Sequence, residues 1–298
     1  MFRKSILTAS ASALMLFGIT PASAADLYEP ALPDLSAVMS LYAGGAALNT
    51  SGGSNTDSDY GQGSHWLAGG DARVAGQSWQ LELVAGALGD ADSCSDCDEA
   101  GSNYLALAGH MLGRGETGTW GVFGGFAHVG HQDTQDTSGS FFGGVEYAHF
   151  MGNSTLFGQL GGTFAIVGET SDTWERGGFG RLGWRYFWTD HSKLEIDGMV
   201  GFGVFDANST TGVTAGWGAE FEHQFSAPFS GFIAYSGHYV EHSSNNSCCE
   251  DYKIVSHALL LGFRVDVNSE SLFQRDRSGA GTFNIPDLHR AYAWPDEL

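Results

Sequence analysis

The fold is decided by stretches in which apolar and polar side chains alternate, as in residues 78–87, SWQLELVAGA. The odd positions of this stretch are Trp, Leu, Leu, Ala and Ala, and the even positions are Ser, Gln, Glu, Val and Gly. Residues 213–225, VTAGWGAEFEHQF, alternate in the same way. Because successive side chains of a strand point to opposite faces, each stretch predicts a β-strand with one apolar and one polar face.

The same alternation recurs outward from these two stretches and predicts about twelve strands. We expect them near residues 37–49, 64–75, 78–88, 103–113, 118–130, 140–151, 155–167, 177–189, 193–205, 213–225, 230–241 and 253–267. Tight turns alternate with longer polar connections, which is typical of outer-membrane barrels. The sequence therefore predicts an all-β fold, a closed antiparallel transmembrane β-barrel. A soluble all-β domain is the alternative, since it would show similar alternation.

The N-terminus has the features of a secretory signal. Arg3 and Lys4 precede an apolar stretch at residues 6–19, and Ala22-Ser23-Ala24 resembles a cleavage site. We expect a signal peptide at 1–24, a periplasmic leader at 25–36, the barrel at 37–267 and a tail at 268–298. The tail either stays in the periplasm or plugs the lumen. No other apolar run is long enough for a membrane helix, so a closed barrel in the bacterial outer membrane is expected.

The charge of the chain excludes some classes of function. The formal net charge is −21, and Lys193 and Lys253 are the lysines that follow the signal peptide. Without a basic patch, nucleic acid is not expected as a partner. Phosphate-binding and dinucleotide-binding fingerprints are absent from the sequence, and we expect no cofactor.

Three segments resemble porin-like outer-membrane proteins of Gram-negative bacteria. They are the junction ASAADLYEP at residues 22–30, the first strand with LYAGG at 41–45, and the last strand with HALLLGFRV at 257–265. The junction looks alphaproteobacterial. The resemblance implies outer-membrane lipid and lipopolysaccharide as surroundings, and the barrel assembly machinery as a partner. Such proteins usually end on the last strand with an aromatic residue, whereas about thirty residues follow Val267 here.

The alternation assigns twelve charged residues to the lumen. These are Asp71, Arg73, Glu82, Glu146, Arg181, Arg185, Glu195, Asp197, Glu220, Glu222, Arg264 and Asp266. Acids outnumber arginines in this set, which predicts a small channel for ions or solutes that favours cations. The alternative is a lumen filled by side chains and salt bridges, in a protein that is mainly structural at the cell surface.

Four cysteines fall in two of the longer acidic connections. They are Cys94, Cys97, Cys248 and Cys249, and an oxidising compartment predicts that they form disulfides. Their pairing is open. Four thiolates could instead bind zinc or Cu(I), and the neighbouring acids could hold calcium or bridge lipopolysaccharide. We expect no metal site, and a surface binding module with acidic, cysteine-rich loops is a further alternative.

One polar stretch, His242-Ser243-Ser244-Asn245, resembles the motif of outer-membrane lipid A deacylases. The resemblance implies His242 as base and Ser244 as nucleophile, with Glu250 or Asp251 orienting the histidine. Two features depart from it. The motif is not followed by glycine. By the alternation of side chains, that is, by parity, His242 also lies on the strand face assigned to the lumen, whereas the substrate is a lipid outside the barrel. We therefore expect a protein that is not an enzyme and keep the deacylase as an alternative.

Overall fold

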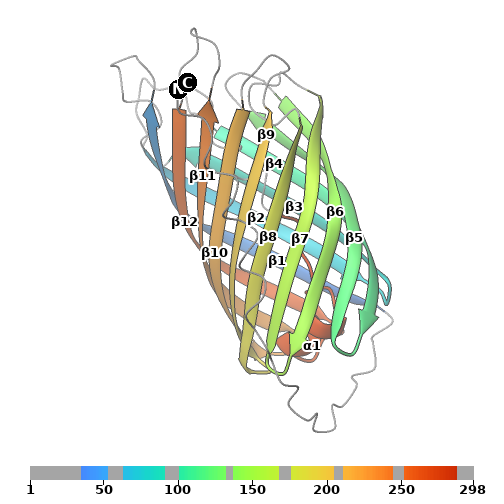
Figure 1. Cartoon of the computed structure of the whole chain (residues 1–298). Helices are drawn as coiled ribbons and strands as arrows, with labels where there is room; N and C mark the ends of the chain where they lie inside the picture. Colours follow the sequence, from blue (N-terminus) through green and yellow to red (C-terminus); the bar gives the residue numbers. More distant parts are fainter. Residues whose placement is uncertain are drawn as a thin grey trace. The chain divides into compact units, whose positions relative to one another are not determined.

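The chain forms a closed antiparallel β-barrel, seen here in a computed structural model (Figure 1). The structure describes residues 35–52, 63–90, 101–131, 137–167, 176–204, 211–243 and 252–286. Residues 1–34, which include the expected signal peptide and the expected leader up to residue 34, lie outside this part. Each strand pairs with its neighbours in sequence, and β1 pairs with β12 to close the barrel.

The strands are β1 (Ser36–Gly52), β2 (Gly63–Ala75), β3 (Trp79–Asp90), β4 (Gly101–Gly115), β5 (Gly118–His131), β6 (Thr137–Met151), β7 (Ser154–Val167), β8 (Arg176–Thr189), β9 (Ser192–Val204), β10 (Thr211–Ser226), β11 (Phe229–Ser243) and β12 (Tyr252–Val267). The predicted fold class is therefore confirmed, and every predicted strand boundary lies within about three residues of the observed one. The described tight turns all lie at one end of the barrel, which we call the short-turn end. The opposite end is the long-loop end.

The outer surface of the barrel is apolar. Leu41 and Phe202 are among its exposed side chains, and so are Trp79, Trp120 and Trp188 near the short turns. Aromatic residues at the ends of strands are typical of a barrel whose wall lies in a bilayer. Within the described residues, no helix is long and apolar enough to cross a membrane.

The inner face is less polar than the alternation predicted. Phe123, Phe142 and Phe179 belong to one buried cluster, in which the centroid of the Phe123 ring lies 6.4 Å from that of Phe142 and 6.3 Å from that of Phe179. Glycine makes room for them: a Cβ at Gly161 would lie 2.7 Å from the Phe179 ring, and one at Gly125 would lie 2.6 Å from the Phe142 ring. Part of the high glycine content is thus explained by large rings that lie flat against the inside of the wall.

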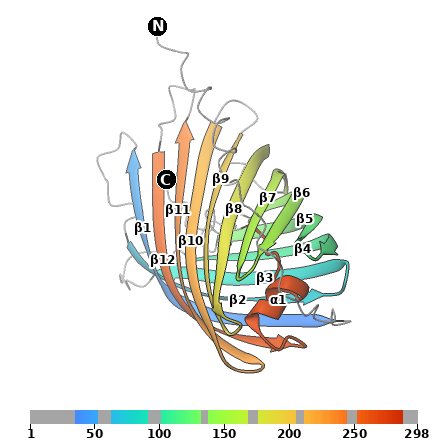
Figure 2. The same cartoon turned by 60° about the horizontal axis from the view of Figure 1, so that its bottom comes forward.

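After β12 the chain turns into the short-turn end of the barrel. Asn268 has a φ of 63°, a left-handed conformation that asparagine tolerates better than most residues. The helix α1 (Leu272–Ser278) follows and lies across the short-turn end (Figure 2). Ser271 caps it by accepting a hydrogen bond from the Gln274 backbone N–H. Residues 279–286 continue without regular structure, and we call residues 269–286 the plug segment.

Candidate functional site

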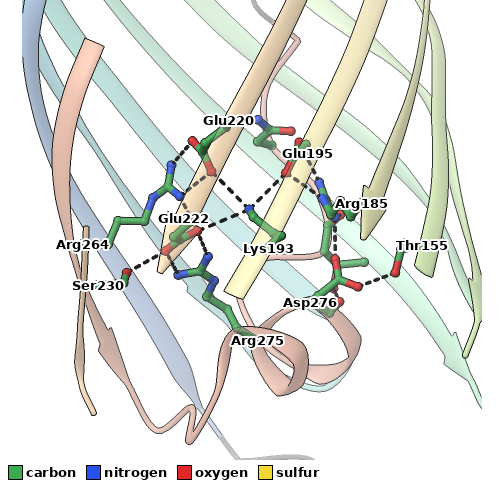
Figure 3. A network of polar contacts seen from close by, with 12 residues as sticks. Thr155, Arg185, Lys193, Glu195, Glu220, Glu222, Ser230, Arg264, Arg275 and Asp276 are labelled. Atoms are coloured by element: carbon green, nitrogen blue, oxygen red, sulfur yellow. Dashed lines mark hydrogen bonds and ion pairs between the residues drawn. The ribbon is translucent and has the colours of Figure 1, made fainter. Parts of the chain in front are cut away.

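All of the charged residues assigned to the lumen by parity lie on the inner face of the barrel. Asp71, Arg73, Glu82, Glu146, Arg181, Arg185, Glu195, Asp197, Glu220, Glu222, Arg264 and Asp266 are buried or half-buried there. Five of them, Arg185, Glu195, Glu220, Glu222 and Arg264, meet in one polar network that includes Arg275 and Asp276 of the plug segment (Figure 3).

Five further charged residues belong to this interior, in addition to the twelve that the alternation assigned to the lumen. Lys193 and Arg114 come from β9 and β4, and Arg275, Asp276 and Arg277 come from α1. Lys193 has the same parity as Glu195, so alternation alone could have identified it. With these additions the described interior holds nine acids and eight bases, so its charges nearly balance.

Glu222 is the centre of the network. Its carboxylate is fully buried and contacts three cations: Arg264 Nη1 at 2.6 Å, Lys193 Nζ at 3.3 Å, and Arg275. Ser230 Oγ donates a further hydrogen bond to it at 2.6 Å. Charge-assisted bonds of this kind are about twice as strong as neutral ones. They join α1 to strands β9, β10, β11 and β12.

Asp276 makes the second connection between α1 and the wall. Its two carboxylate oxygens accept hydrogen bonds from Arg185 Nη1 at 2.7 Å and from Thr155 Oγ1 at 2.6 Å. Arg185 also donates to Glu195 at 2.8 Å, and its guanidinium lies 4.2 Å from the centroid of the Phe157 ring. The aromatic ring and the two carboxylates therefore hold this buried cation in one orientation.

The remainder of the plug segment is held largely, though not entirely, through its backbone. Gln80 Nε2 donates to the Phe283 carbonyl at 2.8 Å, and the Ile285 N–H donates to Glu82 Oε2 at 2.8 Å. The Phe283 ring is buried in a cluster that includes Leu112. Buried backbone N–H and C=O groups need hydrogen-bond partners. Here the inward side chains of β3 bond them, whereas in a sheet a neighbouring strand would do so.

A cavity of about 210 Å³ lies inside the barrel and includes Asn284, Ile285 and Pro286 of the plug segment in its lining. Its charged lining comprises five acids and three arginines, namely Asp71, Glu82, Glu195, Asp197, Glu220, Arg73, Arg181 and Arg264. Arg275, Asp276 and Arg277 do not line it. The acids of the lumen are therefore concentrated around the cavity.

The structure tests the enzyme-like stretch through its backbone. His242 pairs with Gly212 and Tyr252, and the register of β11 is regular through Glu241 and His242. A bulge that reversed the parity, which deacylation of a lipid outside the barrel would need, is therefore not present in this part of β11. Ser244 and Glu250 lie outside the described residues.

The four cysteines also lie outside the described residues, so their pairing stays a prediction. In the part of the chain that the structure describes, no group of three or more His, Cys, Asp or Glu side chains is arranged to hold a metal ion.

Comparison with known proteins supports the fold. No protein-family model and no curated protein sequence matches the chain. Among solved structures, the COG4313 outer membrane channel from Pseudomonas putida F1 matches 83% of this chain and 100% of its own, with 11% identity and a TM-score of 0.51. The KdgM porin in complex with disordered oligogalacturonate matches 76% of this chain and 98% of its own, with 6% identity and a TM-score of 0.44. At these identities the likeness shows the fold alone. With its apolar outer surface, the chain has the fold of a β-barrel of the Gram-negative outer membrane.

Proposed function

We propose that this protein is a channel for small solutes in the outer membrane, and that the plug segment closes its periplasmic end. The proposal is carried by one observation: a cavity with charged walls lies inside a closed barrel, and helix α1 of the plug segment is attached to the wall of that barrel by buried ion pairs. A permanent filling would be more stable if it were apolar, because buried ion pairs gain little over well-packed hydrophobic residues. Polar attachment favours a segment that can be displaced.

We further propose that the channel favours cations, on two grounds. At the cavity, the side chains of Asp197 and Glu220 are 23% and 18% exposed, whereas those of Arg181 and Arg264 are 7% and 8% exposed. The long connections at residues 53–62, 91–100, 132–136, 168–175, 205–210 and 244–251 contain fourteen acids and no Lys or Arg. Acids along the path of an ion favour cations over anions.

Conductance in planar bilayers tests the channel. We expect small or rare currents from the full-length wild type and larger currents from an Arg275→Ala, Asp276→Ala double variant, because this variant loses the ion pairs that join α1 to the wall. In a potassium chloride gradient the reversal potential should indicate preference for potassium, and Glu220→Gln should reduce that preference. Glu222→Gln is the poorer test of selectivity, since Glu222 is fully buried under α1.

An Arg176→Gln variant is the matched control, because Arg176 is exposed and outside the lumen. It should conduct as the wild type does. Absence of current from both the wild type and the double variant, with folding shown by circular dichroism, would contradict the channel. Preference for chloride would contradict the cation assignment.

We also propose the partners that the resemblance implies. Of the ten basic residues in the described ranges, Arg176 and Lys253 are the two that face outward, and both lie at the long-loop end. Lipopolysaccharide phosphates are suitable anions for them, and the Arg176→Gln, Lys253→Gln variant should co-purify with less lipopolysaccharide than the wild type. Insertion by the barrel assembly machinery predicts loss of the folded protein when that machinery is depleted.

The cysteines are proposed to be oxidised. Thiol labelling of intact cells should then require a reductant first. Labelling without reductant, with release of zinc, would instead support a metal site.

A further inference from the structure

We infer that the cavity above the plug segment binds a small amphipathic organic cation, an amine joined to a hydrocarbon group about the size of benzene. The inference rests on the proposed channel function and names the class of solute that the channel recognises. It also predicts binding that can be measured without any current.

The cavity has its space because two inward positions of one strand are glycines, which have no side chain. Gly216 and Gly218 are inward positions of β10, and Gly218 pairs with Asp197 of β9. A Cβ at Gly218 would lie 3.3 Å from Asp197 Oδ1. A larger residue here would fill the space beside that carboxylate oxygen, so glycine keeps the oxygen accessible to a ligand.

Asp197 retains capacity to accept hydrogen bonds. Its Oδ2 accepts one from Arg181 Nε at 2.8 Å, and within the described residues Oδ1 has no hydrogen-bond donor. The guanidinium of Arg181 is more fully used, since its Nη1 donates to Asn284 Oδ1 at 2.7 Å and to Gln159 Oε1 at 3.3 Å. A carboxylate offers about four acceptor positions, so a ligand that enters here meets free acceptors in preference to free donors.

A second carboxylate lies within reach of the same ligand. Asp197 is opposite Gly218 and Glu220 is two residues further along β10, so the two acids are diagonal neighbours on one face. Diagonal neighbours lie about 7–8 Å apart, a span that one ammonium group can bridge with hydrogen bonds to both side chains. Arg264 donates to both oxygens of Glu220 at 2.7 Å, and Lys193 Nζ lies 3.2 Å from Oε1. Glu220 therefore has fewer open acceptor positions than Asp197, and we expect Asp197 to be the main partner of the ammonium group.

Apolar side chains also line part of the cavity, and this part fits a hydrocarbon group. Met199, Ala234 and Leu260 line the cavity beside the carboxylates. The volume of about 210 Å³ exceeds the roughly 150 Å³ of an engineered apolar cavity that binds benzene. The difference leaves room for an ammonium group on a methylene. Inorganic cations would leave this apolar part of the cavity unused.

Calorimetry on the full-length protein in detergent provides the test, with three probes of one shape: benzylamine, benzyl alcohol and benzoate. Benzylamine should bind, benzyl alcohol should bind at least about tenfold more weakly, and benzoate should not bind. Asp197→Asn should weaken the binding of benzylamine about tenfold or more, the loss expected when a hydrogen bond to a charged group is removed. Ala234→Leu should weaken the binding of benzylamine and of benzyl alcohol equally, because the larger side chain fills the apolar part of the cavity.

Glu116→Gln is the matched control, because Glu116 is an exposed carboxylate in the turn between β4 and β5. It should bind benzylamine as the wild type does. Circular dichroism and the shift in gel mobility on boiling check that each variant is folded. Equal binding of benzylamine and benzoate, no binding by the wild type, or unchanged binding by Asp197→Asn would each overturn the inference. Benzylamine binding without current in any variant would support the site and contradict the channel.

Discussion

Among single residues, those that matter most here are buried charges with several partners. Arg275 contacts both Glu222 and Asp266, and its Nη1 lies 3.0 Å from Asp266 Oδ2. Removing it would leave Asp266 without its arginine in a buried site. Arg277 differs, since it donates to the neutral carbonyls of Gly152 and Ser154, each at 2.8 Å. The two arginines are two positions apart on one short helix, so they form a matched pair.

Arg275→Gln should lower the free energy of unfolding by about 3–5 kcal/mol, the cost of breaking a buried ion pair from one side. Arg277→Gln should lower the free energy of unfolding by about 1–3 kcal/mol, because its hydrogen bonds are to neutral carbonyls and its ion pair with Asp276 is longer, at 3.5 Å. Urea unfolding in detergent micelles, followed by tryptophan fluorescence, measures both. Equal losses would contradict the assignment of Arg275 as the main attachment of α1.

The charged residues that the alternation assigned to the lumen lie on the inner face, and the omissions from that set have identifiable causes. Lys193 was missed although its parity was correct, and Arg114 was missed because β4 runs two residues beyond its predicted end. The partners themselves could not be predicted. Gln80 and Phe283 are far apart in sequence, and alternation along one strand does not report which distant segment meets its face.

At the scale of elements, the plug segment depends on the turn that directs it inward. Asn268 connects β12 to this segment, and its Nδ2 donates to the Leu35 carbonyl at 2.8 Å. The helix that follows was not predicted, although Ser271 and Gln274 have the spacing of a helix N-terminus. Because α1 has seven residues, it offers too little periodicity for the pattern that identified the strands.

Asn268→Val should reduce the free energy that holds the plug segment in the barrel by about 1–3 kcal/mol, because a β-branched residue is strained at a φ of 63°. Asn268→Gly should keep the conformation and lose the bond to Leu35. Trypsin treatment of outer-membrane vesicles opened to expose the periplasmic face reports the result. We expect Arg275 and Arg277 to be protected in the wild type and in the glycine variant, and cleaved faster in the valine variant. Equal cleavage in all three would contradict the role of this turn.

The whole molecule is a closed sheet whose outer face is apolar, and these features were the most predictable. Alternation and connection lengths indicated twelve strands and closure, because a membrane barrel must repeat the same inside–outside pattern in every strand. The contents of the lumen were less predictable, since they depend on a segment without that pattern.

The wild type should remain folded in SDS without heating and should change its gel mobility after boiling, because a closed barrel has no sheet edge from which to open. Circular dichroism should show mainly β-structure. A spectrum dominated by helix, or full solubility without detergent, would contradict the fold.

The single residue between β12 and the plug segment has a kinetic consequence. A plug segment that left the lumen would still be covalently attached beside its own binding site. Short tethers of this kind hold their ends at millimolar effective concentrations. Return to the closed state would therefore be a first-order event within one molecule, independent of how many copies a membrane contains. Each barrel would open and close independently of the others.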